Sequence, residues 1–537
     1  MKPTPRRLPR GIRVRTAPPA DLAPAAAQAA AQSFAPASGR QARTESRRRA
    51  PGWLLLLVGA GIFFGTLDQT VVVTVLPDIL RDIKLSIIRD LGQAPWIVTG
   101  YLLGYTVAMP VVGRLADVFG RVRVFVLCLA IFAVGSVLVA VSPSLPALVL
   151  ARCFQAVGGG GLLPVGLAIA ADVTGRRRAL ALGSLAAANN GSTFIGPVWG
   201  AAIAGVWNWR AIFWLNVPLV LPMMLAAPLL ARDLPPEGRR RIDWPGAALL
   251  LLGLSAATIA LTDDGANPRP LWLSLALGVV GVALLALFVR VELRTPLPMI
   301  DLRVLRGGHV AAAMLTYFLI GGALITALVN VPLMTDTLYG GSTTRGGLNL
   351  MRLLLLLPVG GVLGGWLATR AGYRLTVLLG VALACGGFIW MHAWPFSPRD
   401  PAVLEPSTWH LWGALGAIGL GLGLCDGPIV ATVIEAVHER QRATASALLL
   451  VVWTAGMIVG LALLATQGLS YFGSRIATVD LTDPHLLLKT QAIQHDVFNR
   501  TFVAAALALA VAFLAAFGLR AGRASEVLVS PYEGLGE

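Results

Sequence analysis

Residues 113–123 read GRLADVFGRVR, a charged stretch between apolar segments at 96–113 and 124–142. Apolar segments of about 18 residues or more are long enough to cross a bilayer as helices. The stretch therefore predicts a short connection between two transmembrane helices that run in opposite directions. An ordinary solvated loop is the alternative interpretation of the same charges.

The glycines and the charged residues of this connection are expected to have different structural roles. We expect Gly113 and Gly120 to permit a tight turn, because glycine adopts backbone conformations that other residues avoid. Asp117 can accept hydrogen bonds from helix N-termini and can pair with Arg121 or Arg123. The predicted loop thus combines a glycine turn with a charge pair at the helix ends.

Apolar segments like these recur along the whole chain. The sequence is 56% hydrophobic and 13% charged, more apolar than a soluble protein of 537 residues needs to be. The predicted spans are 53–77, 96–113, 124–142, 147–171, 180–205, 211–231, 245–262, 271–290, 310–335, 351–370, 374–394, 408–436, 443–467 and 498–520. The pattern predicts an all-α integral membrane protein with fourteen transmembrane helices.

A weaker copy of the charged stretch, GWLATRAGYR, lies at 365–374, between the tenth and eleventh spans. Two such loops in corresponding places predict an internal repeat of two halves. The predicted organisation is a disordered basic tail at 1–50, an N-terminal six-helix half at 51–231, linkers with two inserted helices at 232–309, a C-terminal six-helix half at 310–520, and a tail at 521–537.

The net charge of +16 could suggest a nucleic-acid partner, but its distribution argues against one. Lys and Arg cluster in the first 50 residues and in alternate connections, with about three times as many on one side of the membrane as on the other. Such residues favour the cytoplasmic side. We therefore expect a multi-pass protein of the cell membrane, inner or plasma, with both termini cytoplasmic.

The stretch at 113–123 fits the pattern GxLADxxGR and resembles the signature loop of the major facilitator superfamily. The resemblance implies a major facilitator fold of two six-helix halves, here with two inserted helices, in which 113–123 is a gating loop. The family often has Arg directly after the Asp, whereas this chain has Val118. We therefore expect one of the family's gating contacts to be absent.

Five further stretches resemble the fourteen-helix drug:proton antiporter branch of that family. They are LDQTVVVTVLPDI at 67–79, WIVTGYLLG at 96–104, ARCFQAVGGG at 151–160, NNGSTFIGPVWG at 189–200 and WRAIFWLNVP at 209–218. The fourth of them resembles the branch's antiporter motif, with Gly191, Gly196, Pro197 and Gly200.

Other stretches resemble the mycobacterial exporters of triacylglycerol and glycolipid that work beside a periplasmic lipoprotein. They lie in both halves: VVVT at 71–74, WIVTGYLLGY at 96–105, GLLPVGLAIAAD at 161–172, LPVGGVLGGWLATRAG at 357–372 and GLGLGLCDGP at 419–428. The resemblance implies a hydrophobic small molecule or lipid as substrate, protons and membrane lipids as partners, and a periplasmic lipoprotein as a further partner.

The chain departs from those exporters at three positions. They carry Glu where this chain aligns Asn190 and Arg where it aligns Trp453, while Asp426 stands at a position that is apolar in them. Both members of a charged pair are thus replaced together, and we expect Asn190 and Trp453 to face one central cavity. Asn189 is predicted to line that cavity with them; bonding or packing between helices is the alternative for the two asparagines.

Three charged residues lie well inside predicted spans, away from the span edges, where charge is costly and marks function by default. Asp68 and Asp426 are candidate proton carriers, and the resemblance implies that Arg152 supports proton transfer. Each has a structural alternative: Asp68 and Asp426 as hydrogen-bonded acids, and Arg152 as an arginine that snorkels to the outer surface.

Together these features predict a proton-coupled secondary exporter of hydrophobic compounds, either lipids or drugs. A membrane-embedded lipid-modifying enzyme is the alternative, but the long connections lack the clustered acids that would hold a metal and a nucleotide. A channel would not need the repeated loops, and no ATP-binding motif is present. No catalytic residue, metal site or cofactor is predicted.

Overall fold

The computed structural model describes residues 52–83, 95–173, 178–230, 243–261, 269–295, 298, 302–303, 307–339, 343–394, 408–437, 442–476 and 486–520. The predicted tails at 1–50 and 521–537 lie outside these residues, as does most of the linker 232–244.

The described residues form long α-helices and no strand. The helices are α3 (Gly52–Asp82), α4 (Trp96–Phe119), α5 (Arg121–Ala140), α6 (Leu145–Val173), α7 (Arg178–Val206), α8 (Trp209–Leu230), α9 (Trp244–Leu261), α10 (Leu271–Arg294), α11 (Gly308–Thr337), α12 (Thr343–Ala371), α13 (Tyr373–His392), α14 (Thr408–Glu435), α15 (Arg442–Ile476) and α16 (Leu486–Ala516). Each predicted span overlaps one of them.

Within the described residues, twelve of these helices are long and apolar enough to cross a membrane. The other two, α7 and α15, contain shorter apolar stretches at Gly191–Val206 and Leu448–Leu463. In each of them the described apolar stretch is shorter than the helix itself. The described residues thus form fourteen helices at the fourteen predicted spans, and twelve of these helices meet the length and apolarity needed to cross a membrane.

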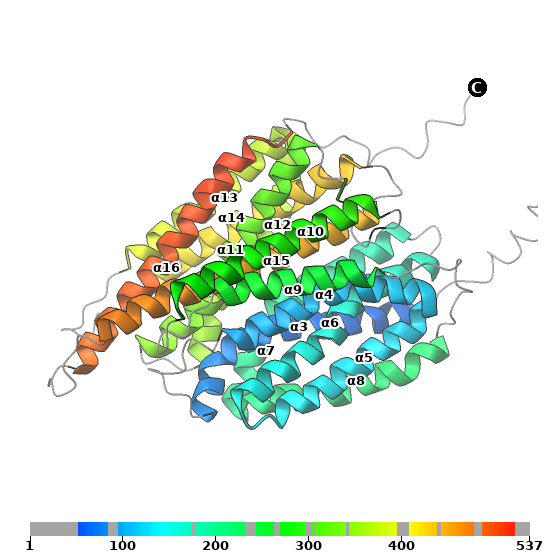
Figure 1. The fold of residues 1–537 in the computed structure, drawn as a ribbon, viewed down its shortest axis with the longest axis horizontal. Coiled ribbons are helices and arrows are strands. Elements are labelled where there is room, and N and C mark those ends of the chain that lie inside the picture. The colour runs from blue at the N-terminus through cyan, green and yellow to red at the C-terminus, as the bar shows by residue number, and fades with distance from the viewer. Residues whose placement is uncertain are drawn as a thin grey trace, which may run out of the picture. The chain divides into compact units, whose positions relative to one another are not determined.

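The six helices α3–α8 pack in a pattern that α11–α16 repeat (Figure 1). The pairs α4–α6, α5–α6, α3–α7 and α5–α8 correspond to α12–α14, α13–α14, α11–α15 and α13–α16. This correspondence is the internal repeat that the two charged stretches predicted. Helices α9 and α10 pack against each other, and α9 also packs against α4 and α15.

Two glycines at equivalent positions of the repeat make the sharp turns between helices. Gly120 separates α4 from α5 with φ 99°, and Gly372 separates α12 from α13 with φ 88°. Both values lie in the left-handed region that favours glycine. Gly113, which was expected to share the first turn, instead lies inside α4. One positive-φ residue reverses the chain here, so the second glycine is not needed.

The glycine run 158–161 of α6 allows close helix packing. A Cβ at Gly158 would lie 2.5 Å from the Cys128 carbonyl oxygen of α5, and one at Gly160 would lie 2.5 Å from the Tyr105 carbonyl oxygen of α4. Small residues let membrane helices approach in this way. The run therefore packs α6 against two neighbours.

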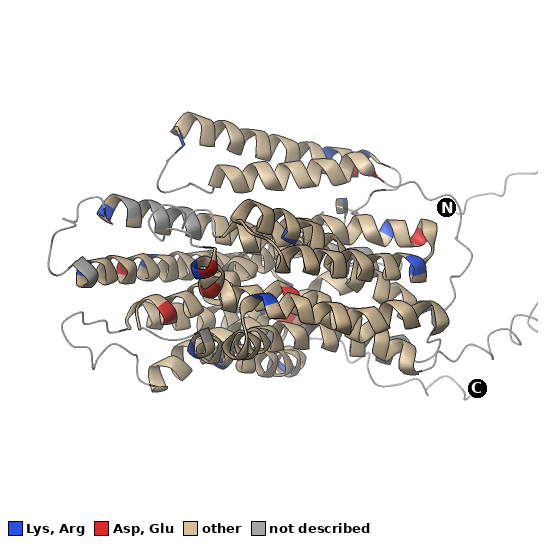
Figure 2. Cartoon of the chain, turned by 90° about the horizontal axis from the view of Figure 1, so that it is seen from below, with Lys and Arg blue, Asp and Glu red and all other residues tan. Residues whose placement is uncertain are grey.

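The connection expected at 468–497 is largely helical. Helix α15 continues to Ile476 and α16 begins at Leu486. Hydropathy detects only the part of a helix that fits the hydrocarbon layer, so it predicts a loop at these more polar helix ends. Figure 2 shows that most charged residues lie toward helix ends, with few in the middle of the bundle.

The two halves meet through specific polar contacts. Thr106 of α4 donates a hydrogen bond to Thr454 of α15 at 2.9 Å, with both hydroxyls buried. Arg81, near the end of α3, pairs with Asp336 near the end of α11 and also with Asp78 one turn earlier in α3. The ion pair between Arg81 and Asp336 thus joins the halves at the C-terminal end of α3.

Candidate coupling and substrate site

Asp68 lies at the middle of α3 and is completely buried. Its Oδ2 forms an ion pair with the guanidinium of Arg152 from α6. Its Oδ1 accepts hydrogen bonds from Gln155 Nε2 at 3.2 Å and Asn216 Nδ2 at 3.1 Å. One carboxylate therefore ties together three helices, α3, α6 and α8.

Arg152 is as deeply buried as its partner, so it does not snorkel to the surface. Its Nη2 donates to the Asp68 carbonyl oxygen at 3.1 Å and its Nη1 donates to Gln155 Oε1 at 2.8 Å. The guanidinium carbon lies 4.0 Å from the centre of the Tyr101 ring, within the range of a cation–π contact. The charge is thus held by a carboxylate, an amide and an aromatic face.

Three polar residues complete this network. Gln155 and Asn216 both donate to Ser136 Oγ, at 2.8 and 3.3 Å, and Ser136 donates to the Phe132 carbonyl oxygen at 2.9 Å. All three side chains are buried. Hydrogen bonds to its remaining atoms help a buried ion pair to repay its desolvation, and these residues provide such bonds to the carboxylate and to one guanidinium nitrogen, while Arg152 Nε has none among the described residues.

Sequence reasoning selected Asp68 and Arg152 separately, but it predicted neither their ion pair nor its hydrogen-bond partners. The signal was present, because Gln155 lies within the quoted stretch 151–160 and Asn216 within 209–218. Tyr101 lies within the stretch 96–104. The sequence alone does not show which side chains bond to each other when their residues lie up to 148 positions apart.

Asp426 belongs to a second cluster, in the C-terminal half. The carboxylate of this half-buried α14 residue accepts a hydrogen bond from Tyr317 Oη of α11 at 2.7 Å. The Tyr317 ring in turn lies 4.6 Å from the ring of Trp453 of α15, centre to centre. An acid, a phenol and an indole thus meet from three helices.

The two clusters are separate. Among the described residues, no hydrogen bond or ion pair joins Asp68 or Arg152 to Asp426. Asp68 has a cationic partner, whereas the described contact of the Asp426 carboxylate is a neutral phenol. The two predicted proton carriers therefore occupy different electrostatic environments.

The antiporter motif packs α7 against α3. A Cβ at Gly196 would lie 2.1 Å from Thr70 Oγ1, and one at Gly200 would lie 2.9 Å from the Val71 carbonyl oxygen. A Cβ at Gly191 would meet nothing within 4 Å. The Pro197 carbonyl oxygen also lies 3.3 Å from where a Cβ of Gly347 in α12 would be. The motif therefore lies between the two halves.

The predicted cavity residues are only partly described. Asn189 accepts a hydrogen bond from Thr66 of α3 at 2.8 Å, so it bonds across helices. The side chain of Asn190 lies outside the described residues. Trp453 is half-buried and belongs to the Asp426 cluster. That Asn190 and Trp453 face one cavity stays a prediction.

The stretch 113–123 holds α4, α5 and α6 together. Arg121 pairs with Asp117 at 3.3 Å and donates to the Ala168 carbonyl oxygen of α6 at 3.3 Å. Arg123 is exposed and Val118 is half-buried. Of the two arginines expected to pair with Asp117, Arg121 does so in this structure.

A family model, described as Major Facilitator Superfamily, matches residues 22–461 of the chain. Curated relatives with similar sequences include a triacylglyceride transporter of Mycolicibacterium smegmatis, 38% identical over 427 residues, which covers 78% of this chain and 76% of the relative. A triacylglyceride transporter of Mycolicibacterium hassiacum is 37% identical over 440 residues, covering 79% of this chain and 81% of the relative.

Solved structures share the fold at lower sequence identity. A bacterial homologue of the human lysosomal transporter Spinster, in an inward-facing and unoccupied conformation, superposes with a TM-score of 0.58 at 17% identity, covering 88% of this chain and 98% of that one. A structure from a study of proton-dependent oligopeptide transporters gives 0.56 at 17% identity, with 87% and 98% covered. The family model and the curated relatives show that the chain belongs to the Major Facilitator Superfamily, as a multi-pass membrane transporter rather than an enzyme.

Proposed function

We propose that this transporter exports a neutral lipid of the triacylglycerol class in exchange for protons, and that Asp68 carries the proton. The observation behind this proposal is the buried ion pair of Asp68 and Arg152, enclosed by Gln155 and Asn216. Charge buried at this depth in a membrane protein is costly and rarely serves packing alone.

The ion pair supplies a physical mechanism for coupling. Protonation of Asp68 removes the negative charge that holds Arg152, so the guanidinium must rely on Gln155, the Asp68 carbonyl and the Tyr101 ring. A buried charge that loses its partner costs about 3–5 kcal/mol. That cost favours a shift of α3 against α6, which is how proton binding would change the arrangement of the helices.

The lipid part of the proposal is supported by the relatives, which are triacylglyceride transporters in mycobacteria. We extend it to a periplasmic lipoprotein partner that receives the lipid, with both termini cytoplasmic and the chain in the plasma or inner membrane. The gating role of Gly120, Asp117 and Arg121 belongs to the same proposal, because their contacts tie three helices together at one membrane end.

Lipophilic cations are a second candidate substrate class. The half-buried carboxylate of Asp426 lies beside the aromatic rings of Tyr317 and Trp453, and its described partner is uncharged. A carboxylate with adjacent aromatic faces is the combination that recognises an organic cation. This observation favours drug export alongside lipid export, and it also keeps Asp426 as a second proposed proton site.

The test is transport by purified protein in proteoliposomes, with a fluorescent triacylglycerol and a lipophilic cationic dye measured side by side. We expect triacylglycerol movement that is faster with an inward proton gradient and that the Asp426→Asn variant retains. Triacylglycerol movement no faster than in protein-free vesicles would refute the lipid assignment, whatever the dye does.

A further inference from the structure

The outward face of the inserted helix α10 is not covered by another of the described helices. Its most apolar stretch is only 11% buried, far less than that of α3 at 67%. Its packing partner is α9, and exposed residues such as Val279, Val282 and Leu287 run along its free side. A helix this apolar and this exposed must face lipid acyl chains.

Two arginines stand at the end of that uncovered face. Arg290 and Arg294 lie one turn apart on α10, and both are exposed. Positions i and i+4 share one side of a helix. Among the described residues neither guanidinium has a hydrogen bond or an ion pair. Like charges at this spacing repel, and within the described part of the chain no carboxylate pairs with either arginine.

The acidic residue between them faces the other way. Glu292 is 1% exposed, and its Oε1 lies 2.9 Å from where a Cβ of Gly246 in α9 would be. It therefore points into the contact between α9 and α10. The helix thus directs its negative charge inward and its two positive charges toward the lipid.

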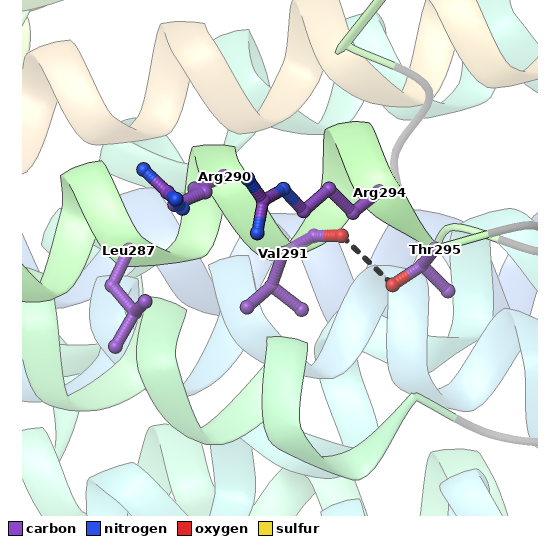
Figure 3. Close-up of a pocket in the computed structure, with 5 residues that line it drawn as sticks. All are labelled: Leu287, Arg290, Val291, Arg294 and Thr295. Atoms are coloured by element: carbon purple, nitrogen blue, oxygen red, sulfur yellow. Dashed lines mark hydrogen bonds between the residues drawn. The ribbon is translucent and has the colours of Figure 1, made fainter.

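The arginines line a hollow on the surface of the protein. Its volume is about 380 Å³, and its walls are Leu287, Arg290, Val291, Arg294 and Thr295. Figure 3 shows both guanidinium groups on one side of α10, with the apolar Leu287 near them. The hollow therefore offers positive charge at the membrane end of the helix and apolar surface toward the bilayer.

We propose that this hollow binds an anionic phospholipid, whose phosphate lies between Arg290 and Arg294 and whose acyl chains lie along the exposed side of α10. Guanidinium groups bind phosphate through paired hydrogen bonds, and basic pockets on membrane helices attract anionic head groups. A phospholipid is the occupant that suits both the charge and the apolar flank, since a free phosphate ion would use only the charge.

The site has a structural connection to the stretch 113–123. Arg114 at that end of α4 donates a hydrogen bond to the Pro298 carbonyl oxygen at 2.7 Å, four residues beyond Arg294. The segment that follows the hollow is thus fastened to the end of α4. The lipid site does not depend on the transported substrate or on proton coupling.

The test is native mass spectrometry of the full chain in mild detergent, with phosphatidylglycerol and phosphatidylcholine added in competition. We expect wild-type protein to retain phosphatidylglycerol in preference by on the order of tenfold. Arg290→Gln/Arg294→Gln should lose that preference. Arg370→Gln/Arg374→Gln is the matched control: it removes two charges at the same membrane end, from side chains that lie over the Trp366 and Phe517 rings, and should keep the preference.

Equal retention of the two lipids by wild-type protein would overturn the proposal without recourse to any variant. An unchanged preference in Arg290→Gln/Arg294→Gln, or in either single variant if the double one does not fold, would also overturn it. Inorganic phosphate should not displace the bound lipid. Displacement at millimolar phosphate would mean that the hollow holds an ion rather than a phospholipid.

Discussion

Asp68 and Arg152 form the most constrained charged contact described in the chain. Each is fully buried, and each has partners beyond the other: Gln155 bonds to both, and Asn216 bonds to the carboxylate. Satisfied buried networks fix side chains in one arrangement, while loss of one member leaves the others exposed to desolvation cost. We therefore expect that loss of one member of this network makes the remaining side chains rearrange.

Asp68→Asn tests the proton-carrying role at this scale. The amide cannot take up a proton under physiological conditions, yet it keeps the shape of Asp and an oxygen that Arg152 can contact. We expect gradient-driven transport to fall to the level seen without a gradient, while the protein still inserts and folds, with a lower melting temperature because Arg152 loses its counter-charge. Undiminished pH-dependent transport by this variant would move the role to Asp426 or elsewhere.

The sequence allowed Asp68 and Arg152 to be chosen, because charge inside an apolar span is conspicuous. It did not reveal Asn216 or Ser136, since neutral polar residues in such spans are common and their partners lie on other helices. Tyr317 was missed for the same reason: a tyrosine in an apolar helix is unremarkable until a carboxylate appears 2.7 Å away.

Helices were more predictable than contacts. Every span was placed from apolar length alone, because a bilayer requires long runs of apolar residues. Helix ends were less predictable: α12 begins at Thr343 and α16 at Leu486, each well before the apolar run. These ends are polar, so the hydrophobic signal that identifies a span does not report them.

At the contact between α3 and α7, two glycines of one motif should respond differently to the same substitution. Gly196→Ala would place a Cβ 2.1 Å from Thr70 Oγ1, whereas Gly191→Ala would meet nothing within 4 Å. Overpacking costs about 1–3 kcal/mol. We expect Gly196→Ala to lower the melting temperature in detergent and Gly191→Ala to leave it unchanged. Equal melting temperatures would contradict the close packing of α7 on α3.

The replacement of a charged pair by Asn190 and Trp453 leads us to predict that these positions of α7 and α15 are coupled. If both side chains face one cavity, Asn190→Glu alone buries an unpaired charge. This should destabilise the protein by about 3–5 kcal/mol, or else weaken export. Adding Trp453→Arg should recover part of that loss, as a double-mutant cycle of melting temperatures or transport rates would show. Strict additivity would mean that the two positions are not coupled.

At the scale of the whole molecule, two similar halves carry different chemistry. The N-terminal half contains the paired acid Asp68, and the C-terminal half contains Asp426 with its aromatic neighbours. The halves are joined by Thr106 and Thr454 within the bundle and by Arg81 and Asp336 at one end.

The asymmetry of Lys and Arg predicts an orientation in the membrane, which can be measured directly. In a variant without native cysteines, single cysteines at Pro5→Cys and Asp480→Cys should react with an impermeant thiol reagent from opposite faces of the membrane. We expect the first to be protected in intact cells and the second to be labelled. Labelling of both from the same face would contradict the predicted topology.

The central claim is that lipid export and proton entry are one coupled process through Asp68. It is tested most directly by trapping a pH indicator on the side of the membrane that protons should reach, in proteoliposomes that contain the wild-type protein. Adding triacylglycerol should then start proton movement, and the Asp68→Asn variant should show none. Lipid transport by the wild-type protein with no accompanying proton movement would contradict the account.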